Sequence, residues 1–124
     1  VRPFNIFWPE EVRQTLEFQN VDGKTVVVGT VGNAGTNPQL IMRTGDYSYI
    51  ITIINKDTIP HRLYVDGVNA STKLLQPDEE DVIVIRSKHD TKFNYYDIAN
   101  GTKILGTIQV VHVIPLDRLE ANKK

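Results

Sequence analysis

Short runs in which apolar and polar side chains alternate recur along the chain, with turn-forming residues between them. This alternation predicts strands over residues 15–19, 24–31, 40–43, 47–54, 61–65, 81–86, 92–96 and 104–113. Asp22-Gly23 indicates a hairpin between the first two runs. Residues 9–14 begin with proline followed by two acidic residues, which favours a single helical turn. Many short strands and little helix predict an all-β sandwich with Greek-key connections.

The length and the pattern divide the chain into three parts. At 124 residues it is long enough for one domain with a two-layer core, expected over residues 15–114. Residues 1–14 form an apolar lead that contains the single tryptophan, and we expect it to pack on the domain or to dock on a partner. Residues 115–124 form a polar C-terminal tail.

Composition and charge narrow the classes of function. The net charge of −1 at pH 7 gives no basis for binding nucleic acid. No apolar run is long enough for a transmembrane helix, so membrane attachment would need an anchor that this chain does not contain. The chain begins at Val1 rather than methionine, which is typical of a mature or truncated product.

Two stretches carry a family resemblance. Asn55-Lys56 is followed by Pro60-His61, and the later stretch runs from Tyr95-Tyr96 through a loop to Gly106 and Val110. Together they resemble the cupredoxins, the small copper-binding β-sandwich family of plastocyanin and azurin, over roughly residues 45–111. The resemblance implies a cupredoxin-like Greek-key β-sandwich.

The copper ligands of that family are largely absent from the sequence. When the final loop is aligned on Gly106 and Val110, Ile104 stands at the methionine position, Ala99 at the second histidine and Tyr96 at the cysteine. Only His61 matches a ligand. A blue-copper site needs a cysteine thiolate, and the chain has no cysteine, so a thiolate-based copper site is excluded and no cofactor is expected. We expect Ile104 and Ala99 to be packing residues that hold the former ligand loop.

The resemblance without its ligands predicts a non-catalytic domain that works outside the cytoplasm as a structural or accessory subunit of a larger assembly. One alternative is an atypical copper-binding or electron-transfer module in which His61 acts with oxygen ligands from Asp97 or Tyr96. Another is the soluble domain of a membrane-anchored oxidase-like subunit. In each case a protein partner or a larger complex is expected.

Other motifs add little chemistry. The sequence contains no G-x-S-x-G or H-E-x-x-H signature, so no hydrolase is indicated. His89 and His112 do not stand at a chelating spacing from His61. Asn69 and Asn100 begin N-x-[ST] sequons and are candidate glycosylation sites.

Overall fold

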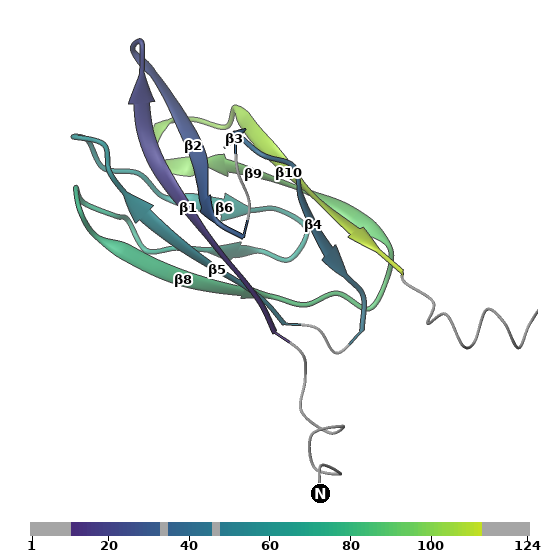
Figure 1. Ribbon diagram of the computed structural model, residues 1–124. Coiled ribbons are helices and arrows are strands. Elements are labelled where there is room, and N and C mark those ends of the chain that lie inside the picture. Colours follow the sequence, from purple (N-terminus) through teal and green to yellow (C-terminus); the bar gives the residue numbers. More distant parts are fainter. Residues whose placement is uncertain (1–10, 33–34, 46–47, 113–124) are drawn as a thin grey trace, which may run out of the picture.

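The computed structural model describes residues 11–32, 35–45 and 48–112, and these residues form two packed β-sheets (Figure 1). The first sheet has the strand order β3-β2-β1-β5-β8, and the second has the order β4-β10-β9-β6-β7. The strands of the first sheet are β1 (Glu11–Val21), β2 (Lys24–Val31), β3 (Gly35–Thr36), β5 (Ser48–Asn55) and β8 (Glu80–Ile85). Those of the second are β4 (Leu40–Arg43), β6 (Leu63–Val65), β7 (Ala70–Ser71), β9 (Thr91–Asp97) and β10 (Ile104–Val111). The predicted all-β cupredoxin-like sandwich is confirmed.

The hairpin of β1 and β2 follows directly from its turn residues. Asp22 and Gly23 both adopt positive φ angles, 53° and 80°, as a two-residue hairpin turn requires. Val21 then pairs with Lys24 and Phe18 with Val27. The strand β1 begins at Glu11, so the helical turn predicted over residues 9–14 is wrong for the described residues 11–14. Extension of β1 is stabilised by parallel pairing with β5, which begins with Glu11 opposite Ser48.

The core lies between the sheets and follows the alternation of each strand. On β5, Tyr49, Ile51 and Ile53 face the second sheet, and Phe93, Tyr95 and Ile108 face back toward them. These side chains are at most 6% exposed. Burial of an aliphatic or aromatic side chain stabilises a fold by roughly 1.5–3 kcal/mol, so this apolar layer supplies the main driving force for folding.

The other strand predictions agree closely with the described structure. The run predicted over residues 61–65 is shorter as a strand, because His61 makes only an isolated bridge with Leu75 before β6 begins at Leu63. Short strands β3 and β7 lie in segments for which the alternation predicted no strand. Residue 113, the lead residues 1–10 and the tail 115–124 lie outside the described residues, so the predicted domain boundaries stay a prediction.

Helical structure within the described residues is limited to one short 3₁₀ turn, η2 (Ile98–Asn100), after β9. Over the same part of the chain, no helix has the length and apolar character needed to cross a membrane.

Candidate functional site

His61 lies inside the sandwich with its imidazole fully buried, 0% exposed. Its Nε2 atom is 2.7 Å from Oδ2 of Asp57, and its Nδ1 atom is 2.6 Å from Oδ2 of Asp97. The ring also stacks on Phe18 of β1, with ring centroids 4.6 Å apart and planes inclined by 16°. Both ring nitrogens and one ring face are therefore in contact with other side chains. We call the group of Asp57, His61 and Asp97 the histidine cluster.

Asn55 holds the loop that presents Asp57 and His61. This residue ends β5 and is fully buried, and its amide nitrogen donates to the carbonyl oxygens of Ile59 and Leu75 at 2.9 and 2.8 Å. Its side-chain oxygen accepts a hydrogen bond from the N–H of Asp57. A buried amide with these partners fixes a loop because breaking any of the bonds would leave a buried polar group unpaired. The Asn-Lys-x-x-x-Pro-His segment is thus a hydrogen-bonded loop rather than a flexible connection.

Asp97 stands at the end of β9 and connects three parts of the chain. Its Oδ1 accepts from the backbone N–H groups of Arg62 and Ala99, and its Oδ2 accepts from the side-chain amide of Asn100 at 2.6 Å. The bond from Ala99 caps the η2 turn. Asp97 therefore ties the loop after β9 to the loop that carries His61.

The electrostatics of the cluster favour an ionised carboxylate of Asp57 beside His61. Burial opposes ionisation of Asp57, but hydrogen bonds from His61 and from the Thr58 N–H outweigh it and lower the pKa of the Asp57 carboxyl. An ionised carboxylate only accepts hydrogen bonds. The Nε2 atom of His61 therefore donates to the ionised carboxylate of Asp57. Both ring nitrogens of His61 are thus occupied by carboxylates, and its ring has no exposed surface.

The structure brings only one of the two predicted oxygen partners to His61. Asp97 is a direct neighbour, whereas Tyr96 lies on the opposite face of β9 and packs edge-to-face on Tyr64, with ring centroids 5.3 Å apart. Successive residues of a strand point to opposite faces, so a shift of one position decides which side chain reaches the cluster. Asp97, rather than Tyr96, occupies the position beside His61.

The prediction that Ile104 and Ala99 pack in the core is wrong. Ile104 is 52% exposed, and Ala99 is exposed in the η2 turn. A β-bulge at Leu105 explains the position of Ile104, since Gly106 pairs with Tyr95 but Ile104 pairs with Tyr96. Residues directly opposite each other share a face, so Ile104 points outward with Tyr96. The inserted residue changes the face that Ile104 would otherwise present.

Gly106 lies on the inner side of the same bulge. A Cβ atom at this position would collide with the ring and hydroxyl of Tyr95. The Tyr95 hydroxyl donates to the carbonyl oxygen of Pro38 at 2.6 Å, and burial raises the pKa of this tyrosine, so it stays neutral. Gly106, one of the residues that carry the family resemblance, is thus needed because the buried ring of Tyr95 lies close to its backbone.

The donor set does not fit a type 1 copper ion. Within the described residues, no three His, Cys, Asp or Glu side chains converge as a metal site would require. The carboxylates of the histidine cluster lie on opposite edges of one imidazole, so a metal at either ring nitrogen would displace a carboxylate from its hydrogen bond. His89 and His112 are both exposed. Metal binding at His61 stays a prediction.

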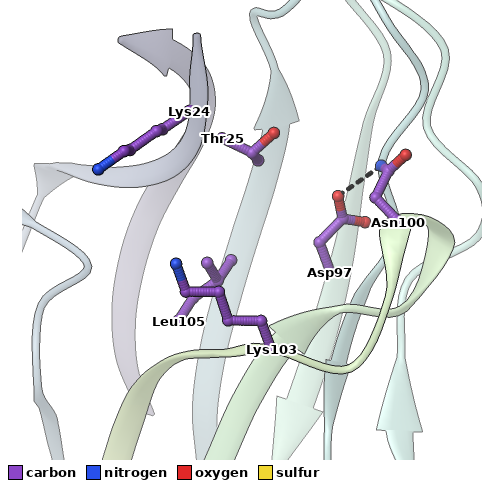
Figure 2. Close-up of a pocket in the computed structure, with 6 residues that line it drawn as sticks. All are labelled: Lys24, Thr25, Asp97, Asn100, Lys103 and Leu105. Carbon is purple, nitrogen blue, oxygen red and sulfur yellow. Dashed lines mark hydrogen bonds between the residues drawn. The ribbon is translucent and has the colours of Figure 1, made fainter. Parts of the chain in front are cut away.

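A shallow pocket of about 190 Å³ lies next to the cluster (Figure 2). Its lining comes from the start of β2, the end of β9, the η2 turn, the loop after it and the start of β10: Lys24, Thr25, Asp97, Asn100, Lys103 and Leu105. Pockets for drug-sized ligands usually measure about 300–1,000 Å³, so this one suits at most a small group. The carboxylate of Asp97 in its wall is already engaged with Asn100 and His61.

The two candidate glycosylation sites differ in the state of their side chains. The amide nitrogen of Asn100, to which a glycan would be attached, lies 2.6 Å from Asp97 and 3.1 Å from the Pro60 carbonyl oxygen. A glycan there would break these contacts. Asn69 is exposed and uses its side-chain oxygen, not its nitrogen, to bind the Tyr64 hydroxyl. Asn69 is the better of the two candidates on geometry, and glycosylation itself stays a prediction.

Sequence reasoning did not identify Asp57, Asn55 or Phe18 as members of the site. Asp57 stands four residues before His61 in a loop, and this spacing alone does not show that the two side chains meet. Phe18 comes from a strand more than forty positions away from His61, and only the folded sandwich brings the rings together. The one sequence feature that pointed to Asp57 was its position between the end of an apolar strand and the Pro60-His61 pair.

Comparisons with known proteins agree with the fold. No protein-family model matches the sequence, and no curated protein sequence matches it. Among solved structures, rusticyanin from Thiobacillus ferrooxidans has a TM-score of 0.60 and 12% sequence identity, over 84% of this chain and 78% of rusticyanin.

Two multicopper oxidases are also similar. The enzyme from Campylobacter jejuni has a TM-score of 0.58 and 14% identity, and McoA from Aquifex aeolicus has 0.56 and 16%. These matches cover 84% and 93% of this chain but only 26% and 28% of the oxidases, so the chain corresponds to about a quarter of each enzyme. At such low identity the likeness concerns the fold alone, and the chain has the cupredoxin-like β-sandwich fold.

Proposed function

We propose that this chain is a non-catalytic, cupredoxin-like domain without type 1 copper, which serves outside the cytoplasm as a structural or accessory subunit of a larger assembly. The observation that carries this proposal is the occupation of His61. The one histidine that matches a copper ligand has a carboxylate at each ring nitrogen, at 2.6 and 2.7 Å, and has no exposed surface.

The remaining ligand positions support the same proposal. Tyr96 packs on Tyr64 on the outer face of the second sheet, and Ala99 and Ile104 are exposed. The histidine cluster joins the loop before β6 to the loop after β9, a connection that a copper ion makes in a copper-binding cupredoxin. Charge-assisted hydrogen bonds are about twice as strong as neutral ones, so such a cluster can hold the two loops together.

Metal analysis tests the absence of copper. Protein incubated with Cu(II) or Zn(II) and then passed through a chelating column should retain far less than one metal ion per chain. The His61→Gln variant should retain the same small amount, and neither protein should show an intense visible band. Stoichiometric copper in the wild type that is lost in His61→Gln would instead favour the atypical copper module with Asp97.

A second measurement tests the accessory role. The chain isolated under mild conditions from the cells that produce it should elute together with a partner in fixed stoichiometry. Gentle isolation of the chain without any stoichiometric partner would contradict this part of the proposal.

A further inference from the structure

The open edges of the two sheets differ in length. β3 and β7 have two residues each and β4 has four, whereas β8 has six residues and lies at the end of its sheet (Figure 1). One side of β8 pairs with β5, from Tyr49 opposite Ile85 to Ile54 opposite Glu80. Its other side has no paired strand among the described residues. A long edge with apolar side chains favours pairing with another strand.

The outer face of β8 is apolar at its centre and charged at its ends. Val82 and Val84 are 47% and 50% exposed. Glu80, two positions before Val82, makes no ion pair with a described residue. Arg86 continues the register of the strand beyond Ile85, and its Nε donates to the hydroxyl of Ser48 on β5 at 2.9 Å. The residues that point outward along β8 are therefore, in chain order, an acid, two valines and a base: Glu80, Val82, Val84 and Arg86.

This order is complementary to itself when the strand is reversed. If two copies of β8 run antiparallel about a twofold axis at Ile83, Val82 of each copy faces Val84 of the other. Glu80 then faces Arg86, and this ion pair forms twice because the interface is symmetric. Directly opposed apolar pairs and opposite charges both stabilise antiparallel strands.

The backbone of β8 can form the same arrangement. The N–H of Val82 turns away from β5, since it donates to the Asp81 side chain at 2.8 Å. Antiparallel strands alternate the side to which backbone groups point, so the N–H and carbonyl groups of Val82 and Val84 face the open edge. These are the residues that the reversed strand places opposite each other. The hydrogen bond from the Val82 N–H to Asp81 must break before a second β8 strand can pair. We therefore expect the association of two chains to be reversible.

We propose that β8 pairs with β8 of a second copy of this chain, joining two five-stranded sheets into one continuous sheet across a twofold axis. The pairing surface goes beyond the proposed function, because it involves neither His61 nor a metal. Its occupant is a second copy because both the charge order and the pairing pattern of the backbone are self-complementary. Sedimentation velocity of the full chain from about 1 µM to about 1 mM, where association of ordinary strength is detected, should show a monomer–dimer equilibrium.

Charge variants give the sharpest test. Glu80→Arg places like charges at both contacts, and Arg86→Glu does the same with the opposite sign, so each should weaken dimerisation by about tenfold or more. An equimolar mixture of the two variants should dimerise again, because each mixed dimer regains two Glu–Arg contacts. Glu17→Arg, which changes an equal charge on β1 inside the same sheet, should leave the equilibrium unchanged.

Val84→Pro tests the backbone pairing without altering charge. It removes an N–H group that faces the open edge and is not used by β5, so a proline is tolerated there while dimerisation is lost. If circular dichroism shows that the Val84→Pro variant does not fold, the Val84→Lys variant is tested in its place. A chain that stays monomeric over the whole range overturns the proposal. A dimer that Glu80→Arg and Val84→Pro leave intact also overturns it, because another surface would then join the two copies. The same holds if the equimolar mixture of the charge variants fails to dimerise.

Discussion

The loop that carries His61 and the loop over residues 98–104 both stand where the cupredoxin resemblance places copper ligands, yet their environments are opposite. His61 is fully buried and bonded on both ring nitrogens. Ile98 and Ile104 in the other loop are 40% and 52% exposed. Asp97 and Asn100 join the two, because both side chains reach from the second loop into the first.

The difference teaches how hydrogen bonds, rather than apolar packing, can hold the loop over residues 98–104. On the inside, polar side chains keep the two loops in place through hydrogen bonds to backbone groups. The apolar residues of the loop are not needed for packing and face solvent. The stability of this end of the domain therefore depends on the histidine cluster and little on the isoleucines.

The largest effect is expected from His61→Ala. The variant leaves the carboxylates of Asp57 and Asp97 buried without their shared partner, and it opens a space beside Phe18. Removal of one partner from a buried ion network costs about 3–5 kcal/mol. Urea denaturation followed by circular dichroism measures the free energy of unfolding. His89→Ala, at an exposed position, is the matched control and should change it by less than about 0.5 kcal/mol.

Asp57→Asn should reduce stability by a smaller amount, about 1.5–3 kcal/mol at neutral pH, the usual value of hydrogen bonds to a charged group. The effect should depend on pH. Because the pKa of Asp57 is lowered in the folded state, its contribution is present above the unfolded pKa of about 3.9 and is lost as pH falls through the folded value. The difference in unfolding free energy between wild type and variant should therefore shrink in acid.

Asp90→Asn removes one carboxylate at an exposed position and serves as the control for this series. A difference between wild type and Asp57→Asn that stays constant from pH 7 to about pH 2.5, below the ordinary aspartate pKa, would show that Asp57 is not stabilised as a carboxylate.

Gly106→Ala tests the boundary between the buried side of the bulge and its exposed side. The new methyl group meets the ring of Tyr95, which is held in place by its bond to Pro38. Overpacking of this kind typically costs 1–3 kcal/mol, about enough to lower the melting temperature by several degrees. Thermal unfolding followed by circular dichroism measures it. An unchanged melting temperature would mean that the ring moves freely and that the glycine has no packing role.

The alternation of the sequence predicted most strands because core and surface residues alternate with a period of two, as on β5 and β9. It did not predict the bulge at Leu105, since one inserted residue leaves the local pattern almost unchanged while it reverses the face of Ile104. The resemblance named Asp97 as an oxygen partner of His61 in one alternative, but the sequence did not predict the whole histidine cluster. Asp57 is an ordinary loop residue in the sequence, and its bond to His61 arises from the fold of the loop around Asn55.

The smallest effect is expected from Ile104→Ala, at the position that aligns with the methionine of the family and that we expected to pack in the core. Truncation of a buried isoleucine costs about 2–5 kcal/mol, whereas a surface substitution usually stays within about 0.5 kcal/mol. Ile104 is 52% exposed and faces outward with Tyr96, so the second value applies. Ile108→Ala on the same strand is the matched control, because Ile108 is 0% exposed and should show the full cost. Similar large losses in both variants, measured by urea denaturation, would mean that the bulge does not turn Ile104 to solvent and that apolar packing, in addition to the histidine cluster, holds the loop.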